Sequence, residues 1–162
     1  MEKLKKTTFV AVIMGSKSDQ SIMSECTRHM EYFGIPSQQY ILSAHRTPDE
    51  TAQFAREARG KGIKVIIAGA GMAAHLAGVI AAHTTIPVIG VPLSGSELKG
   101  VDALYSMVQM PSGVPVATVA IGKAGAINAA VLAAEILGIT DDRIHQKLVE
   151  FKKAGCKLPE SL

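Results

Sequence analysis

Short apolar runs alternate with segments of helical periodicity along most of the chain, and this alternation restricts the fold more than any single motif. Apolar runs with the length and composition of buried strands cover residues 9–14, 38–42, 65–68, 87–91 and 114–121. Helical spacing with proline and glycine boundaries predicts helices over 22–33, 48–60, 72–82, within 98–110 and over 124–137, before a last helix capped by Asp141 or Asp142. Such alternation is typical of a parallel sheet with helices on both faces.

The expected fold class is therefore α/β: a single three-layer, doubly wound domain with a five-stranded parallel sheet and a C-terminal helix. Nearly continuous apolar strands agree with this prediction, because parallel strands are covered on both faces. Five strand–helix units favour a flavodoxin-like strand order, 2-1-3-4-5. At 162 residues one domain is the simplest division, with a core over about residues 9–150 between basic N-terminal and C-terminal tails.

Composition and charge exclude several function classes. The net charge is only +3 and aromatic residues make up 4% of the chain, so a nucleic-acid partner is not expected. Two isolated cysteines, Cys26 and Cys156, suggest a reducing compartment. The uncharged stretch 65–96 is divided by glycines and prolines into pieces too short for a bilayer. We expect a soluble, cytoplasmic protein without a membrane partner.

Three loops are expected to meet at one edge of the sheet. In this fold, ligands bind beyond the carboxyl ends of the strands, where the strand order reverses. For the order 2-1-3-4-5 that point lies between the first and third strands. The loops concerned are 15–19, 43–46 and 69–71, which are rich in glycine, hydroxyl and charged residues.

The first of these loops, Gly15-Ser-Lys-Ser-Asp19, allows two interpretations. Free backbone N–H groups, two hydroxyls and a helix start could bind an anion. An ordinary capping segment, with Ser18 or Asp19 as N-cap, explains the same residues and is favoured when the loop is taken alone. The Walker A spacing is missing.

Gly69-Ala-Gly71-Met-Ala-Ala74 approximates a dinucleotide fingerprint. It follows the third predicted strand rather than the first, and no acid ends the next strand, so NAD is not expected. Close approach of a ligand to the backbone is the better interpretation, although a packing role for the glycines stays open.

The strongest local signal is His45 beside Arg46, preceded by Ser43. A guanidinium can hold a phosphate through two hydrogen bonds, and an imidazole can donate and accept a proton near neutral pH. His75 follows the next strand, where site and core roles are equally plausible. No histidine and carboxylate spacing suits a metal, and none is expected.

Several motifs taken together resemble one family. They are Met14-Gly-Ser-Lys-Ser-Asp19, Ser43-Ala-His-Arg-Thr-Pro48, Ala68-Gly-Ala-Gly-Met-Ala-Ala-His-Leu76 and Gln109-Met-Pro-Ser-Gly-Val-Pro115. This set is similar to the 5-(carboxyamino)imidazole ribonucleotide mutases of purine biosynthesis (PurE type, class I). The likeness extends in order from about residue 9 to 150.

The resemblance implies an isomerase that moves a carboxylate from the exocyclic nitrogen of an aminoimidazole ribonucleotide to a ring carbon. It implies no cofactor, a small-molecule ribonucleotide as substrate, and a homo-octamer with active sites near subunit contacts. It also assigns catalysis to His45 and substrate contacts to Ser16, Ser18, Asp19, Ser43 and Arg46. The carboxylate or carbon dioxide is expected to lie against Gly71, Ala73, Ala74, His75 and Leu76.

The sequence departs from the family at Met72, where glycine is common, at Ala77, where proline is common, and in the loop 93–99. These departures affect the expected pocket shape more than the reaction class. Two alternatives stay open. One is a direct carboxylase that uses carbon dioxide, although the motif Ala-Ala-His-Leu at residues 73–76 favours the mutase. The other is a noncatalytic nucleotide-binding domain.

Overall fold

A five-stranded parallel sheet with the order β2-β1-β3-β4-β5 forms the centre of the molecule. The computed structural model describes residues 9–159; the tail lysines Lys3, Lys5 and Lys6 lie outside them. The strands are β1 (Val10–Met14), β2 (Ser37–Ile41), β3 (Val65–Gly71), β4 (Val88–Leu93) and β5 (Ala117–Thr118). The predicted strand order and three-layer α/β class are confirmed.

Six α-helices and one 3-10 turn lie between and after these strands within residues 9–159. Their bounds are η1 (Lys17–Asp19), α1 (Gln20–Tyr32), α2 (Pro48–Glu57), α3 (Leu76–His83), α4 (Val101–Val108), α5 (Lys123–Gly138) and α6 (Asp142–Lys153). No helix in this part of the chain combines the length and apolar character needed to cross a membrane.

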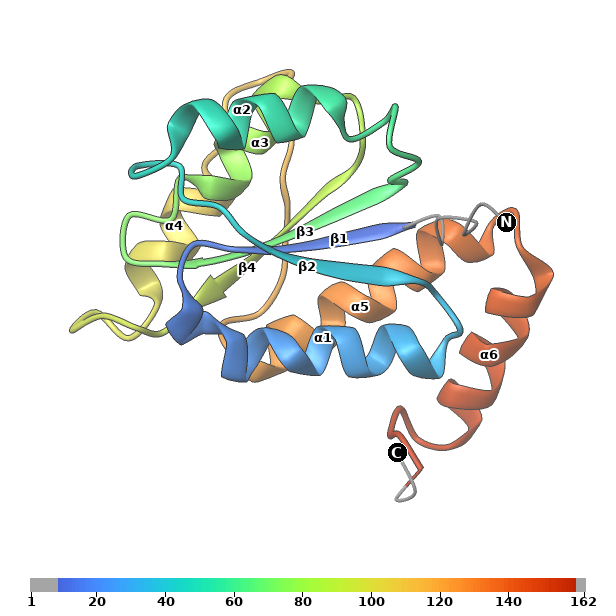
Figure 1. Ribbon diagram of the computed structural model, residues 1–162. Coiled ribbons are helices and arrows are strands. Elements are labelled where there is room, and N and C mark those ends of the chain that lie inside the picture. Colours follow the sequence, from blue (N-terminus) through green and yellow to red (C-terminus); the bar gives the residue numbers. More distant parts are fainter. Residues whose placement is uncertain (1–8, 160–162) are drawn as a thin grey trace.

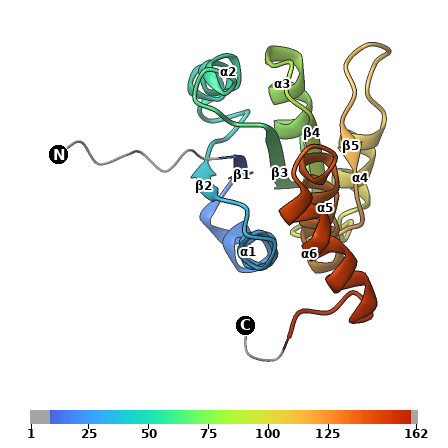
Figure 2. The same cartoon turned by 90° about the vertical axis from the view of Figure 1, so that its right-hand side faces the viewer.

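The helices form two layers because successive strand residues point to opposite faces of the sheet. In β1, Val10, Val12 and Met14 belong to one core cluster, and Ala11 and Ile13 to the other. The first cluster is completed by α1, α5 and α6, and the second by α2, α3 and α4. Figure 1 and the end view in Figure 2 show α1, α5 and α6 on one side of the sheet and α2 and α3 on the other.

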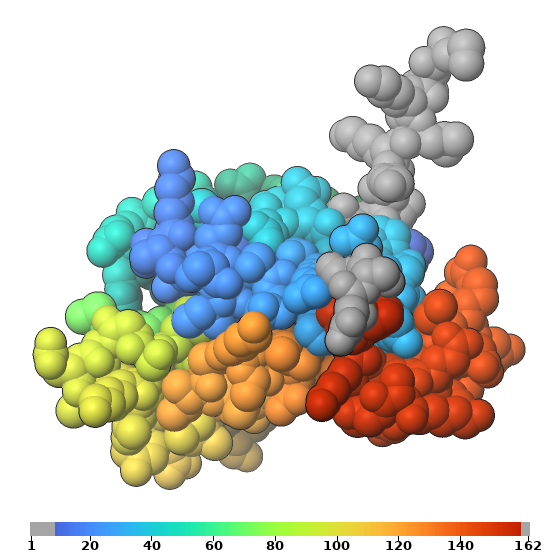
Figure 3. Space-filling model, turned by 90° about the horizontal axis from the view of Figure 1, so that it is seen from below, coloured from blue at the N-terminus to red at the C-terminus, as the bar shows by residue number. Residues whose placement is uncertain are grey.

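The alanine-rich helix α5 packs closely against its neighbours. Ala126, Ala129, Ala130, Ala133 and Ala134 are completely buried, and α5 contacts both α1 and α6. Figure 3 shows these three helices side by side across one face of the molecule, in blue, orange and red. Because these side chains are small, the axes of the packed helices can lie close together. Packing then consists of many short-range van der Waals contacts rather than contacts of a few large side chains.

Two predicted elements differ most in extent from the structure, while the third strand is three residues longer and the second helix three residues shorter than predicted. The fifth strand, predicted over 114–121, pairs with β4 only at Ala117 and Thr118; Pro115 lacks an N–H, and the segment is an exposed sheet edge. The third helix, predicted from Met72, begins at Leu76. Met72 has a φ of 57°, a left-handed conformation that no α-helix contains.

Candidate functional site

A cleft of about 440 Å³ lies at the carboxyl ends of β1, β2 and β3; these strand ends are on the left of the ribbon in Figure 1. The three loops that sequence analysis selected form its walls, and the loop after β4 closes one side. The lining residues are Gly15, Ser16, Ser18, Asp19, Ser43, Ala44, His45, Arg46, Ala70, Gly71, Met72, Ala73, His75, Leu76 and Gly95. The structure therefore brings together every predicted site residue except Ala74.

The first loop is held by a capping box. The Ser16 hydroxyl accepts a hydrogen bond from the Ser18 N–H at 3.3 Å, and Asp19 Oδ2 accepts one from the Ser16 N–H at 3.1 Å. Ser16 is thus the side-chain cap of η1. Of the two predicted caps, Asp19 occupies the N-cap position of α1 without a capping hydrogen bond from its side chain, and Ser18 lies within η1. Ser18 Oγ also lies 3.0 Å from Ser16 Oγ, so two hydroxyls and a carboxylate meet at the start of η1.

Asp19 is a carboxylate in a partly dehydrated position. Burial raises the pKa of Asp19 above its ordinary value of 3.8, although the Ser16 N–H and the Ser18 hydroxyl act in the opposite direction. Water would solvate the ionised form better than this loop does. A ligand hydroxyl that donates to Asp19 would replace part of that missing hydration.

The second loop, Ser43–Thr47, is closed by four hydrogen bonds. Ser43 O accepts from the Thr47 N–H at 2.9 Å and from the Thr47 hydroxyl at 3.2 Å. The Ser43 N–H donates to Thr47 Oγ1 at 3.0 Å, and the Arg46 N–H donates to Ser43 Oγ at 3.1 Å. The side chains of His45 and Arg46 stay exposed on the cleft side of this turn.

His45 and His75 contact each other across the cleft. His45 Nε2 lies 2.8 Å from His75 Nδ1, and the two rings are nearly perpendicular, with centroids 4.9 Å apart. At this distance one nitrogen donates a proton and the other accepts it. Of the two roles considered for His75, the site role is the one this contact favours.

The third loop presents backbone and small side chains. Ala73 and Leu76 line the cleft together with Met72, whereas Ala74 is buried at 1% exposure and belongs to the core. A side chain on Gly71 would meet Leu93 O at 3.3 Å, and one on Gly69 would overlap Met23 Sδ at 2.4 Å. Packing against protein, the alternative kept open above, therefore explains why glycine stands at Gly69.

Five lining residues were not predicted as ligand contacts because they carry no reactive group. They are Gly15, Ala44, Ala70, Met72 and Gly95. Gly95 could have been found, since it follows the carboxyl end of β4, which ends at the same edge as β1 and β3. Ala44 packs its side chain into the second core cluster, a role that a lone alanine does not reveal.

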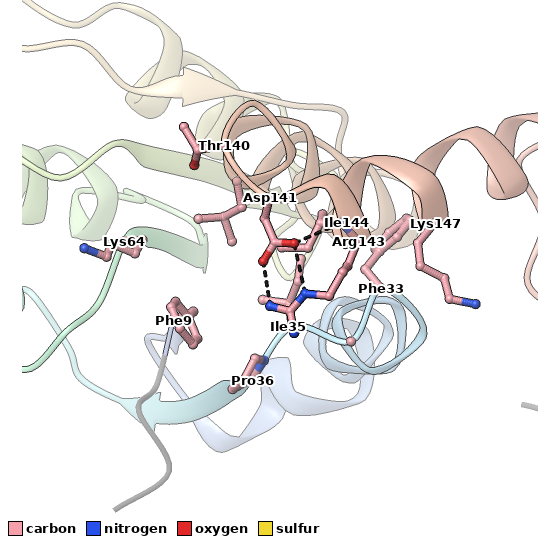
Figure 4. Close-up of a pocket in the computed structure, with 12 residues that line it drawn as sticks. Phe9, Phe33, Ile35, Pro36, Lys64, Thr140, Asp141, Arg143, Ile144 and Lys147 are labelled. Atoms are coloured by element: carbon pink, nitrogen blue, oxygen red, sulfur yellow. Dashed lines mark hydrogen bonds and ion pairs between the residues drawn. The ribbon is translucent and has the colours of Figure 1, made fainter.

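A second hollow of about 550 Å³ lies at the opposite end of the sheet. Figure 4 shows the carboxylate of Asp141 turned toward Arg143, with Phe9 and Pro36 on the other side of the space. Both oxygens of Asp141 are used by Arg143, at 3.2 and 2.9 Å, and no histidine lines the hollow. Proton-transfer groups are thus concentrated at the carboxyl-end cleft. Within residues 9–159, no three His, Cys, Asp or Glu side chains are grouped as a metal would require.

Comparison with known proteins agrees with the motifs. The model of the AIR carboxylase family matches residues 9–157, which include every loop of the cleft. The chain belongs to the AIR carboxylase family.

Relatives of this family cover nearly the whole chain. A Pseudomonas aeruginosa protein named N5-carboxyaminoimidazole ribonucleotide mutase is 56% identical over 146 residues, 90% of each chain. The protein of that name from Escherichia coli strain K12 is 54% identical over 145 residues, 90% of this chain and 86% of the relative. That from Pyrococcus horikoshii is 54% identical over 144 residues, 89% and 80% of the two chains.

A solved structure of the same family has the same fold. Treponema denticola PurE aligns with a TM-score of 0.82 at 28% identity and covers 91% of each chain. The overall fold described above is therefore also that of Treponema denticola PurE. Of the three departures noted, Met72 stands exposed in the cleft, the loop 93–99 contributes Gly95 to the cleft lining, and Ala77 is fully buried in α3. Met72 and the loop 93–99 therefore change the surface that a ligand meets, whereas Ala77 does not.

Proposed function

We propose that this chain is an N5-carboxyaminoimidazole ribonucleotide mutase, an isomerase of purine biosynthesis. It interconverts 5-carboxyaminoimidazole ribonucleotide and 4-carboxy-5-aminoimidazole ribonucleotide. Relatives with this name at 52–56% identity support the reaction class. The observation that carries the site assignment is the 2.8 Å contact of His45 and His75 in a cleft that also holds Arg46 and four hydroxyl or carboxylate side chains.

His45 moves the proton in both halves of the reaction. As an imidazolium it protonates the exocyclic nitrogen, the bond from that nitrogen to the carboxyl carbon breaks, and carbon dioxide is released in the cleft. The ring carbon then forms a bond to carbon dioxide, and neutral His45 removes the proton from that carbon. The proton that His45 donates in the first half is replaced by the one it removes in the second half, so the reaction leaves the histidine unchanged.

The polar loops bind the ribonucleotide. Arg46 and the Ser43 hydroxyl hold the phosphate, since a guanidinium and a hydroxyl are matched donors to phosphate oxygens. Ser16, Ser18 and Asp19 bind the remaining phosphate oxygens and the ribose hydroxyls. Exposure of the Arg46 side chain to the cleft leaves its guanidinium available to a ligand.

The loop after β3 holds the released carbon dioxide. Gly71, Ala73 and Leu76 line this part of the cleft with His75, whereas Ala74 belongs to the core beneath it. Small and apolar side chains around a reacting carboxylate exclude water, and nearby N–H groups stabilise its charge. Retention of carbon dioxide here distinguishes a mutase from an enzyme that takes it from solution.

A direct carboxylase is the second candidate, because the family as a whole is described as AIR carboxylase. The test mixes purified protein with each carboxylated ribonucleotide in buffer freed of carbon dioxide and follows absorbance. A mutase interconverts the two compounds without added carbon dioxide. Turnover that requires added carbon dioxide and unsubstituted aminoimidazole ribonucleotide would assign the carboxylase reaction instead.

We further propose that the chain assembles as a homo-octamer in the cytoplasm. Val101, Tyr105 and Val108 recur at helical spacing on one face of α4 and are exposed, Tyr105 at 65%. Leu98, which precedes α4 in the loop that contains the cleft residue Gly95, is exposed as well. Asp102 Oδ1 is buried and has no hydrogen-bond partner within residues 9–159. A contiguous apolar surface of this kind is usually covered by another subunit.

A further inference from the structure

Thr47 stands at a helix start but does not cap the helix. It occupies the N-cap position of α2, with φ −133° and ψ 55°, and its side chain makes no capping hydrogen bond. A threonine there ordinarily accepts a hydrogen bond from an N–H of the first turn. The hydroxyl of Thr47 turns backward instead, to the N–H and carbonyl of Ser43.

The backward hydrogen bonds of Thr47 join the last residue of the loop to its first residue, Ser43. Thr47 Oγ1 accepts from the Ser43 N–H at 3.0 Å and donates to Ser43 O at 3.2 Å. The Thr47 N–H adds a third bond to Ser43 O at 2.9 Å. One side chain therefore fixes both polar backbone atoms of Ser43, and α2 starts without a side-chain cap.

The residues between the two ends depend on this closure. His45 and Arg46 are exposed, so burial does not set their direction, and His45 is held at its far end by the contact with His75. Ala44, between them and Ser43, is partly buried and packs against the second core cluster. Ser43 Oγ accepts from the Arg46 N–H at 3.1 Å, which leaves the hydroxyl proton of Ser43 free to donate to a ligand. The directions in which the side chains of Ser43, His45 and Arg46 leave the loop are set by the loop backbone.

We propose that Thr47 is a positioning residue that acts through Ser43 to hold His45 and Arg46 in register with the substrate. This inference rests on the proposed function, in which His45 moves the proton and Arg46 binds the phosphate. It adds to that function a group that touches neither substrate nor reacting atoms. A displaced imidazole or guanidinium slows the reaction because reacting groups must be held within fractions of an ångström.

Thr47→Val tests the proposal, because valine keeps the shape and removes only the hydroxyl. We expect kcat/KM to fall by about tenfold or more, with a lower kcat and weaker binding of ribose 5-phosphate measured by calorimetry. Thr47→Ser keeps the hydroxyl and should recover most of both losses. Calorimetry reports on the loop whether or not the protein is a mutase, and wild-type turnover tests the function separately.

Thr51→Val is the matched control. The Thr51 hydroxyl donates to Thr47 O at 2.8 Å, but the Thr51 N–H already donates to the same oxygen at 3.0 Å. Its loss should leave kcat/KM and ribose 5-phosphate affinity near wild type. Urea unfolding of all variants separates positioning from stability. The proposal is overturned if Thr47→Val keeps wild-type kcat/KM and affinity, or if Thr47→Ser is as impaired as Thr47→Val.

Discussion

At the scale of single residues, Asp19 is a cleft carboxylate whose partial burial lowers the stability of the folded protein at neutral pH. Its raised pKa means that the ionised carboxylate costs folding free energy. The stability that Asp19 contributes is fully present at pH values below its pKa in the unfolded chain, 3.8. It is lost as the pH rises through the higher pKa of the folded protein. A group kept partly dehydrated in this way is suited to contact a ligand.

Asp19→Asn should therefore raise the free energy of unfolding relative to wild type at neutral pH. Asparagine keeps an acceptor for the Ser16 N–H and removes the charge. The advantage should begin as the pH rises above about 3.8 and become constant above the folded pKa. Urea unfolding of both proteins from pH 3 to pH 8 measures it. If the stability advantage of Asp19→Asn over wild type instead increased toward acid pH, the prediction would be contradicted.

The two cysteines should differ sharply in reactivity. Burial raises the pKa of the Cys26 thiol to about 12, and its side chain is fully buried, whereas Cys156 is exposed. Because the thiolate is the reactive form, a chromogenic disulfide reagent should modify Cys156 in the native protein and both thiols in urea. Peptide mapping identifies the site, and modification of Cys26 under native conditions would contradict the packing of α1.

At the scale of elements, the start of α5 depends on a glycine. A side chain on Gly125 would come within 1.7 Å of Ala120 O, so the backbone before α5 would have to move. Gly125→Ala should lower the free energy of unfolding by about 1–3 kcal/mol. Gly60→Ala is the matched control, since its added carbon would lie 3.4 Å from the nearest atom, and its effect should stay within about 0.5 kcal/mol. Equal effects of the two substitutions would contradict the close approach at Gly125.

Element order could be predicted from the sequence, but several boundaries could not. Apolar runs and helical spacing are local properties, and they locate β1, β3, β4 and α5 correctly. The extent of β5 depends on hydrogen bonds to β4 beside an edge proline, Pro115, and the start of α3 on the left-handed backbone at Met72. Both depend on tertiary context that residue type does not carry.

Some features of the candidate site could likewise be predicted from the sequence, and others could not. His45, Arg46, Ser16 and Asp19 could be selected because their side chains have chemistry and follow strand ends. The contact of His45 with His75 spans 30 positions, and no local pattern could predict it. The backward turn of the Thr47 hydroxyl is likewise invisible in the sequence, where a threonine before a proline predicts an ordinary helix cap.

At the scale of the whole molecule, the proposed homo-octamer makes the apolar face of α4 a subunit contact. Tyr105→Glu places a charge in the centre of that face and should dissociate the assembly, since an unpaired charge in a buried interface is costly. Ile139→Glu is the matched control, because Ile139 is 82% exposed and lies between α5 and α6, away from α4. Sedimentation equilibrium gives the masses. A monomeric wild type, or an intact Tyr105→Glu assembly, would contradict the assignment.

The most direct measurement of the central claim compares wild type with His45→Asn in two assays on the same preparation. One follows interconversion of the two carboxylated ribonucleotides, and the other measures ribose 5-phosphate affinity. Loss of the proton-transfer group should lower turnover by about 10²–10⁴-fold while Arg46 and Ser43 keep the affinity near wild type. Near-normal turnover by His45→Asn would contradict the assignment of proton transfer to His45.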